Sequence, residues 1–311
     1  EEGVSCFAVP RILPDGSRNT FRLQRLKDKL GDRSNASSEV EFDGTWGRMV
    51  GEPGRGVRTI IEMVGHTRLD CVIGSAALMR RALTEAMWHT AHRSAFGRLL
   101  ADQPLMRNVL ADLAIESEAA VALALRLARA YDEGDVALRR LGTAVGKYWV
   151  CKRTPPMVAE ALECLGGNGF VEESGMPRLF RQSPLNSIWE GSGNVNALDV
   201  LRALTRTPEV LGTYFDELEL AAGADTRLDA FVATVRADFD RPEDLEVRAR
   251  QVVERLALAW QGSLLVRHAP PEVADAFCAS RLAGDAGLAF GTLPAAVDHR
   301  AIVARHMPRT A

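Results

Sequence analysis

GVRTIIEMVGHTRLDCVIGSAALMRRALTEAMWHT, residues 56–90, is the stretch of sequence that decides the fold. Its apolar residues recur at helical spacing: Ile60, Ile61, Val64, Val72, Leu78, Met79, Leu83 and Met87. A helical period held over about 35 residues predicts a helix longer than the average helix of a globular domain. Such a long helix buries its apolar stripe against other helices, so the segment predicts a bundle.

Two further helices follow this segment. The second is marked by Leu105, Val109, Leu113, Val121, Leu125 and Ala128, and the third runs through Leu141, Val145 and Trp149. The turn at 132–135 separates them, and so short a connection makes neighbouring helices antiparallel. We expect Pro155 and Pro156 to kink or interrupt the third helix, because proline lacks the amide hydrogen. The glycine-rich residues 165–169 are expected to end it.

Residues 192–204 predict a fourth helix, with Val195, Leu198, Leu201 and Ala203 on its packed side. The fold class is therefore mainly α, and the four-helix bundle occupies residues 49–205. Residues 206–311 again carry helical periodicity, with prolines near plausible helix starts, and predict an additional helical domain.

The stretch 1–48 differs, because apolar and polar residues alternate at 4–9 and 38–42 around a turn at Pro14-Asp15-Gly16. This alternation predicts strands. Two or three strands cannot bury a core by themselves, so we expect the end of a β domain whose first part lies outside these residues.

Composition excludes several classes of protein. The 311 residues are 47% apolar and 25% charged with net charge −3, which is ordinary for a soluble globular chain. No run of about 18 uncharged apolar residues is present, and the first residues lack the features of a signal peptide. We therefore expect a cytoplasmic protein with no membrane association.

Neither a disulfide framework nor a metal site is predicted. The five cysteines are scattered and form no CxxC pair. Glu85, His89 and His92 share a helix face at the spacing of a bundle metal site, but a second Glu-x-x-His to complete the ligand set is missing from the sequence.

Six segments occur in an order that resembles the acyl-CoA dehydrogenase family, most closely its AidB-like branch, over about residues 1–205. They are KLGDRSNASSEVEF (29–42), GEPGRG (51–56), TRLD (67–70), RSAFG (93–97) with Gln103, LGGNGF (165–170) and NSIWEGSGN (186–194). The resemblance implies removal of the α proton of an acyl thioester while the β hydrogen leaves as hydride to a flavin.

The family's catalytic base lies either on the first bundle helix or in the loop before the last one. Thr67 stands at the first place and cannot act as a base, so the resemblance assigns the role to Glu190. A carboxylate suits a weakly acidic α carbon when its site is desolvated. The resemblance places Trp189 and Gly191 beside the substrate and Arg68 at the same end of the acyl pocket. Without the motif, Glu190 is an ordinary solvated loop acid.

FAD is the cofactor that the resemblance implies. Its contacts would be Arg93, Phe96 and Gln103 from one subunit and Gly166 and Gly167 from another, with Ser192 and Asn194 at the start of the last bundle helix near the cofactor. Such a shared site requires a homodimer or homotetramer. The substrate class is an acyl-CoA thioester, and the AidB-like match favours short branched acyl groups such as isovaleryl.

Two other functions stay open at this point: a DNA-associated alkylation-response protein in which the flavin is structural, and an inactive fragment or assembly partner. Residues 206–311 hold twelve Arg and no Lys against sixteen Asp and Glu. A net acidic domain disfavours phosphate binding unless Arg248, Arg250 and Arg255 gather on one face.

Overall fold

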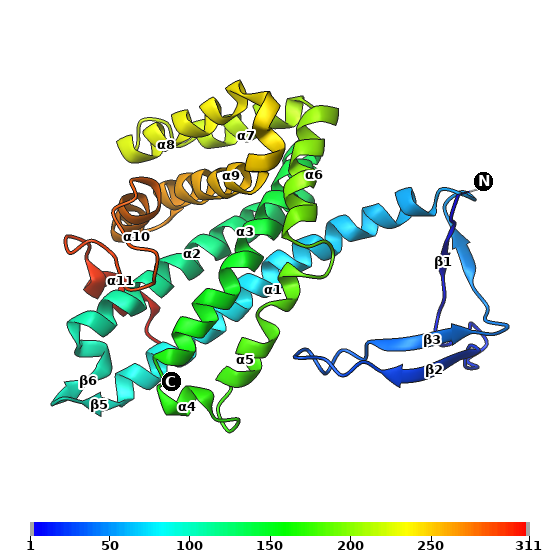
Figure 1. The fold of residues 1–311 in the computed structure, drawn as a ribbon, viewed down its shortest axis with the longest axis horizontal. Helices are drawn as coiled ribbons and strands as arrows, with labels where there is room; N and C mark the ends of the chain where they lie inside the picture. Colours follow the sequence, from blue (N-terminus) through cyan, green and yellow to red (C-terminus); the bar gives the residue numbers. More distant parts are fainter. Residues whose placement is uncertain (1–2, 309–311) are drawn as a thin grey trace. The chain divides into compact units, whose positions relative to one another are not determined.

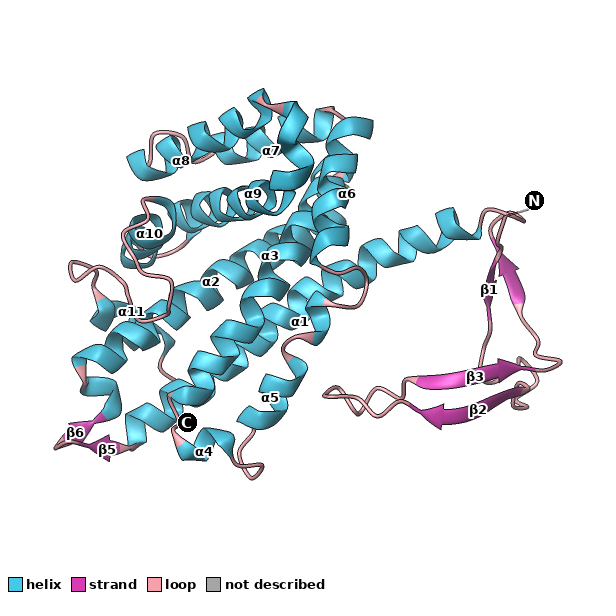
Figure 2. Ribbon diagram, viewed as in Figure 1, coloured by secondary structure: helices cyan, strands magenta, loops and turns pink. Residues whose placement is uncertain are grey.

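The computed structural model describes residues 3–308, which form a mainly helical protein with a few short strands (Figures 1 and 2). The chain divides into two compact units, one up to Thr67 and one from Arg68 onward. The division falls within a single long helix, α1 (Gly56–His92), and each unit is described by itself.

The first unit contains two antiparallel strand pairs. Its strands are β1 (Cys6–Ala8), β2 (Phe21–Leu26), β3 (Ser38–Phe42) and β4 (Arg48–Val50), paired as β1 with β4 and β2 with β3. The strands predicted at 4–9 and 38–42 and the turn at Gly16, with φ of +83°, are confirmed. The sequence analysis missed β2, whose pairing with β3 becomes irregular between Leu23 and Arg25.

The predicted bundle helices are present, and their loops carry shorter elements. The long helices are α1, α2 (Pro104–Asp132), α3 (Val136–Glu163) and α6 (Gly193–Arg206). Between α1 and α2 lie β5 (Ser94–Ala95), β6 (Arg98–Leu99) and the 3-10 turn η1 (Leu100–Asp102). Between α3 and α6 lie α4 (Gly167–Phe170), α5 (Met176–Gln182) and η2 (Leu185–Ser187).

The third helix was expected to be kinked or interrupted at its prolines, and the structure shows that the interruption is wrong. Helix α3 continues through Pro155 and Pro156 to Glu163. It contacts α2, α6 and other helices along its length, and burial on several sides outweighs two missing backbone hydrogen bonds. The buried Thr154 hydroxyl donates to the carbonyl of Val150 (2.8 Å) one turn before the prolines.

The predicted packed side of helix α6 is right only in part, since Leu201 packs against the hydrophobic core but two other predicted residues do not. Val195 and Leu198 are exposed, whereas Asn196 and Asp199 are buried and the predicted Ala203 is buried as expected. Hydrophobic spacing fails here because α6 uses polar side chains to hold a neighbouring loop, as described below.

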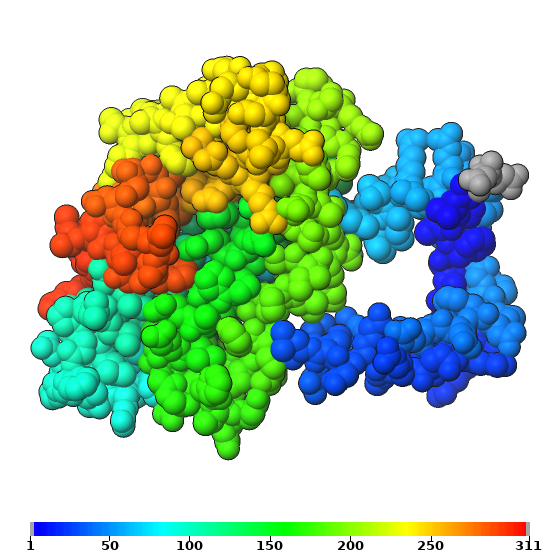
Figure 3. Space-filling model, viewed as in Figure 1, coloured from blue at the N-terminus to red at the C-terminus, as the bar shows by residue number. Residues whose placement is uncertain are grey.

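The C-terminal region is helical, as predicted, and lies against the bundle in the same compact unit (Figure 3). Its helices are α7 (Glu209–Glu219), α8 (Thr226–Ala237), α9 (Leu245–His268), α10 (Pro271–Phe277) and α11 (His299–His306). Short turns complete it: η3 (Asp238–Asp240), η4 (Pro242–Asp244) and the π-helical η5 (Cys278–Leu282). Helix α9 packs on α2, α3 and α6, and its fully buried Trp260 belongs to one hydrophobic core that extends from Leu69 to Val303.

Three further observations concern the described residues only. None of their helices combines the length and apolarity needed to cross a membrane. Across residues 3–308, no group of three or more His, Cys, Asp or Glu side chains is arranged to hold a metal ion. All five cysteines are free thiols, four of them buried.

Candidate functional site

The loop that carries Glu190 has an unusual backbone. Glu190 adopts φ of +56° and Gly191 φ of +101°, directly before α6 begins. A residue with a Cβ pays roughly 1–2 kcal/mol in the left-handed region, whereas glycine adopts it freely. The loop therefore keeps this conformation only because its surroundings hold it there.

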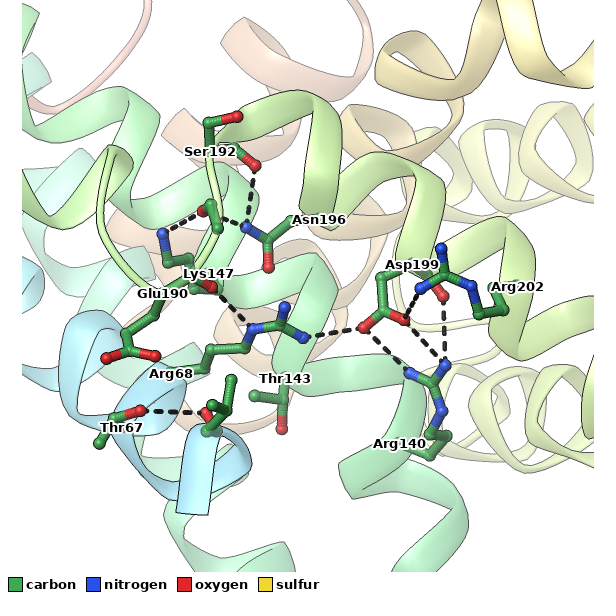
Figure 4. A network of polar contacts seen from close by, with 12 residues as sticks. Thr67, Arg68, Arg140, Thr143, Lys147, Glu190, Ser192, Asn196, Asp199 and Arg202 are labelled. Carbon is green, nitrogen blue, oxygen red and sulfur yellow. Dashed lines mark hydrogen bonds and ion pairs between the residues drawn. The ribbon is translucent and has the colours of Figure 1, made fainter. Parts of the chain in front are cut away.

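The holding contacts are made to three consecutive backbone carbonyls, and Figure 4 shows the one between Arg68 and Glu190. The Lys147 ammonium on α3 donates to the carbonyls of Trp189 (2.8 Å) and Gly191 (2.7 Å). The Arg68 guanidinium on α1 donates to the carbonyl of Glu190 itself (2.9 Å). Charge-assisted hydrogen bonds of this kind are stronger than neutral ones, so two cations fix successive peptide groups on both sides of the Glu190 α carbon.

Helix α6 also supports the loop. The Asn196 amide donates to the carbonyl of Gly191 (2.6 Å). Asp199 accepts from Arg68 (2.8 Å), from Arg140 (3.0 Å) and from Arg202 (3.2 Å). Burial by itself would raise the pKa of Asp199, but Arg140 and Arg68 outweigh it and hold that pKa below its usual value. Asp199 is thus a charged anchor for Arg68.

Glu190 itself is left free. Within residues 3–308 no ion pair is formed by its carboxylate, which projects away from Lys147 and from the Arg68 guanidinium in Figure 4. Its neighbour Trp189 donates from Nε1 to Asn186 (2.9 Å) and keeps 38% of its surface exposed. The loop therefore presents a half-buried carboxylate that can accept a proton.

Two features of this loop were not foreseen from the sequence. Arg68 donates from its guanidinium to the Glu190 carbonyl and to Asp199, and its expected place at the end of the acyl pocket stays a prediction. Lys147 was missed, although it is 1% exposed and burial lowers its pKa. The sequence does contain a sign that Lys147 is buried. It lies three residues after Ala144 and four before Cys151, on an apolar stripe of the third helix.

A second group of predicted residues lines a hollow of about 510 Å³ at the other end of α1. Arg93 lines it together with Gly166 and Gly167 of the same chain, and the expected division of these FAD contacts between two subunits stays a prediction. Gly166 has φ of +58°, and no atom lies within 4 Å of a Cβ built on either glycine. Burial and then Arg93 lower the pKa of His89, which also lines the hollow. An open backbone beside a guanidinium fits an anionic dinucleotide.

Phe96 and Gln103 flank this end of the molecule. Phe96 stands 96% exposed with φ of +53°, at the tip of the β5–β6 hairpin. The Gln103 amide donates to the carbonyl of Ala95 (3.1 Å) and so braces that hairpin. Neither side chain lines the hollow in this chain.

Ser192 and Asn194 form a separate group at the start of α6. Ser192 is the exposed residue that precedes the helix, and Asn194 accepts a hydrogen bond from Arg250 (2.8 Å). The Glu190 loop contacts α1 at Arg68, and the hollow lies beside the end of α1 at His92. At 1.5 Å per residue, Arg68 and His92 are about 36 Å apart along the helix.

The three arginines singled out on α9 do not form a free cationic face. Arg248 and Arg255 both pair with the buried Asp238 (3.2 and 2.7 Å), and Arg250 donates to Asn194. Asp238 pairs with the charges of Arg248 and Arg255, whereas Arg250 is exposed and has a neutral amide partner, so the three do not gather as unpaired cations on one face.

Comparison with known proteins identifies the family. Residues 54–205 match the family described as acyl-CoA dehydrogenase, C-terminal domain. The chain is 46% identical over 280 residues to AidB of Escherichia coli (strain K12), covering 89% of this chain and 51% of that protein. It is 30% identical to acyl-CoA dehydrogenase family member 11 of Caenorhabditis elegans, covering 86% and 48%. The chain thus spans about half the length of the curated relatives it matches.

Solved structures agree. Caenorhabditis elegans ACDH-11, in complex with C11-CoA, matches with a TM-score of 0.83 at 27% identity over 89% of this chain and 53% of that one. An acyl-CoA dehydrogenase of Bacillus anthracis complexed with FAD shares the fold, with a TM-score of 0.67 at 17% identity, over 91% of this chain and 56% of that one. The chain therefore belongs to the acyl-CoA dehydrogenase family, in its AidB-like branch.

Proposed function

We propose that this chain forms the base-bearing part of an FAD-dependent acyl-CoA dehydrogenase in which Glu190 removes the α proton of an acyl-CoA thioester. The α C–H bond breaks and its proton passes to a Glu190 carboxylate oxygen. The β C–H bond breaks and its hydrogen leaves as hydride, so a double bond forms between the two carbons. FAD supplies the hydride acceptor when it is bound.

The observation that carries this proposal is the state of Glu190. The two cations that contact the loop, Arg68 and Lys147, bind backbone carbonyls, and within residues 3–308 no ion pair is formed by the carboxylate. A base must be positioned and must also be available to the proton it takes. Thr67, at the family's alternative position, donates its hydroxyl to the carbonyl of Val64 (3.2 Å) on its own helix.

The distribution of the cofactor contacts supports a homo-oligomer. Arg93, Gly166 and Gly167 would hold the phosphate and adenine portion of FAD. Ser192 and Asn194 adjoin the Glu190 loop, about 36 Å away along α1, which is farther than one FAD molecule extends. The two groups of one chain would therefore serve two different FAD molecules, each shared between two subunits.

The substrate class follows from family membership and from the relative crystallised with C11-CoA. Short branched thioesters such as isovaleryl-CoA are the acyl groups to test first, beside straight chains of increasing length. A panel of thioesters of different acyl length then shows which acyl group the protein accepts.

The test uses protein made from the complete reading frame, wild type and Glu190→Gln, with Glu173→Gln as an exposed acidic control in the same unit. We expect flavin absorbance in all three and anaerobic bleaching by an acyl-CoA in wild type and the control. The Gln variant should bleach about 10²–10⁴-fold more slowly, the usual contribution of a general base. Flavin-free protein, or rapid bleaching by the Gln variant, contradicts the proposal.

A further inference from the structure

The Glu190 loop depends on a buried side chain that sequence reasoning did not identify. Lys147 lies in the middle of α3 and is 1% exposed. Its Nζ lies 2.8 Å from the carbonyl oxygen of Trp189 and 2.7 Å from that of Gly191. A lysine is rarely buried to this degree unless its ammonium has partners, and here the partners that it contacts are both carbonyls of the loop.

These two carbonyls bracket the catalytic candidate. They belong to the residues immediately before and after Glu190, whose own carbonyl is held by Arg68. Gly191 has a second donor in Asn196, but Lys147 is the donor to Trp189 among the described residues. Without Lys147, the peptide group before Glu190 would be free to rotate and the left-handed Glu190 could relax to negative φ.

We propose that Lys147 is a positioning residue for the dehydrogenation, one that sets the direction of the Glu190 carboxylate by clamping the backbone on both sides of it. The inference rests on the proposed function. It assigns Lys147 no contact with substrate or flavin, because its ammonium is spent on the loop carbonyls and faces away from the Glu190 carboxylate (Figure 4).

The expected effect follows from that role. A shift of about 1 Å in a reacting group costs on the order of 10²-fold in rate. Lys147→Met keeps a long side chain but removes both hydrogen bonds, and should lower kcat per bound flavin about 10²-fold. Because the carboxylate acts in the chemical step, KM should stay within about threefold of wild type.

The experiment compares wild type, Lys147→Met and Lys152→Met in protein from the complete reading frame. Lys152 is an exposed lysine on the same helix and controls for the loss of one positive charge. Besides kcat and KM, hydrogen exchange is measured in flavin-free protein for a peptide covering 185–195 and for one in the α9 core, 252–265. Lys147→Gln, which retains one shorter donor, serves as a milder second variant.

The inference predicts exchange at least tenfold faster at 185–195 in Lys147→Met, with 252–265 unchanged, and wild-type values for Lys152→Met. Lys147→Gln should lie between wild type and Lys147→Met in both readouts. Equal acceleration of both peptides with unchanged kcat per bound flavin would show a merely structural role and overturn it. So would unchanged kcat in Lys147→Met while Glu190→Gln is inactive, a result that leaves the proposed function standing. Activity of Glu190→Gln would instead refute the proposed function.

Discussion

Replacing Asp199 with Asn is expected to lower the free energy of unfolding by about 2–3 kcal/mol at pH 7. Removing one partner of a buried ion pair costs about 3–5 kcal/mol, because the remaining charge stays buried and unpaired. Arg68 meets that condition with a side chain only 15% exposed. Arg140 and Arg202 are 34% and 53% exposed, so water can take over their solvation and their share is small. The side-chain oxygen of Asn can still accept one hydrogen bond from Arg68. The expected loss of stability is therefore below the full range of about 3–5 kcal/mol.

The measurement is thermal unfolding followed by helix circular dichroism. In a compact unit of more than 200 residues, 1 kcal/mol shifts the melting temperature by about 2–4 °C, so Asp199→Asn should melt about 4–12 °C lower. Arg202→Ala is the matched control. This variant removes the most exposed of the three arginines that pair with Asp199, and should lower the free energy of unfolding by less than about 1 kcal/mol.

A series of melting experiments at different pH values separates the contribution of the Asp199 charge to stability from the contribution of its side-chain shape. Since Arg140 and Arg68 hold the folded-state pKa of Asp199 below the ordinary 3.8, its contribution is present above that value and disappears as the pH falls through the folded-state pKa. The gap in melting temperature between wild type and Asp199→Asn should therefore close below about pH 4. An equal gap at pH 3 and pH 7, or a loss no larger than that of Arg202→Ala, would refute the reasoning.

Two other predictions concern packing and the C-terminal helix. A Cβ at Gly142 would lie 2.6 Å from the buried Trp260 ring, so Gly142→Ala should destabilise by about 1–3 kcal/mol, whereas Gly212→Ala, in open space on α7, should stabilise by up to about 1 kcal/mol. Urea unfolding of the pair tests the opposite signs, and equal signs would contradict the packing argument. Burial would raise the pKa of Glu118, but hydrogen bonds from His306 and Arg305 lower it to about 2. Glu118→Gln should thus lower the free energy of unfolding by about 3 kcal/mol at pH 7, and the difference from wild type should fade as the pH falls from 4.5 to 2 in the same assay.

The helices were largely predictable because each signal was local. The period from Gly56, the turn after Asp132 and the glycines after Leu165 all act within a few residues, and the structure has helix ends near them. The prolines in α3 misled because their effect is not local. Whether a helix survives two missing hydrogen bonds depends on the packing of its neighbours, which Pro155 and Pro156 do not reveal.

The candidate site was only partly predictable, for a related reason. Motif resemblance pointed to Glu190, but the contacts that shape its loop come from α1, α3 and α6, distant in sequence. Hydrophobic spacing assigned Val195 to the packed side of α6 and passed over Asn196, whereas the reverse holds. A polar residue that binds a backbone carbonyl is worth burying, and periodicity cannot distinguish it from a solvated one.

The arrangement of charge around Glu190 suits a base better than a direct ion pair would. A cation bound to a carboxylate stabilises its ionised form and makes it a weaker proton acceptor. Here the cations Lys147 and Arg68 bind carbonyl oxygens, and Arg68 is balanced by Asp199. The loop is thereby held in a conformation that costs free energy, and neither cation donates a hydrogen bond to the carboxylate. Lys147 and Arg68 thus hold the backbone rigid and at the same time leave the Glu190 side chain available. For this reason, a substitution of Lys147 should lower kcat and not weaken substrate binding.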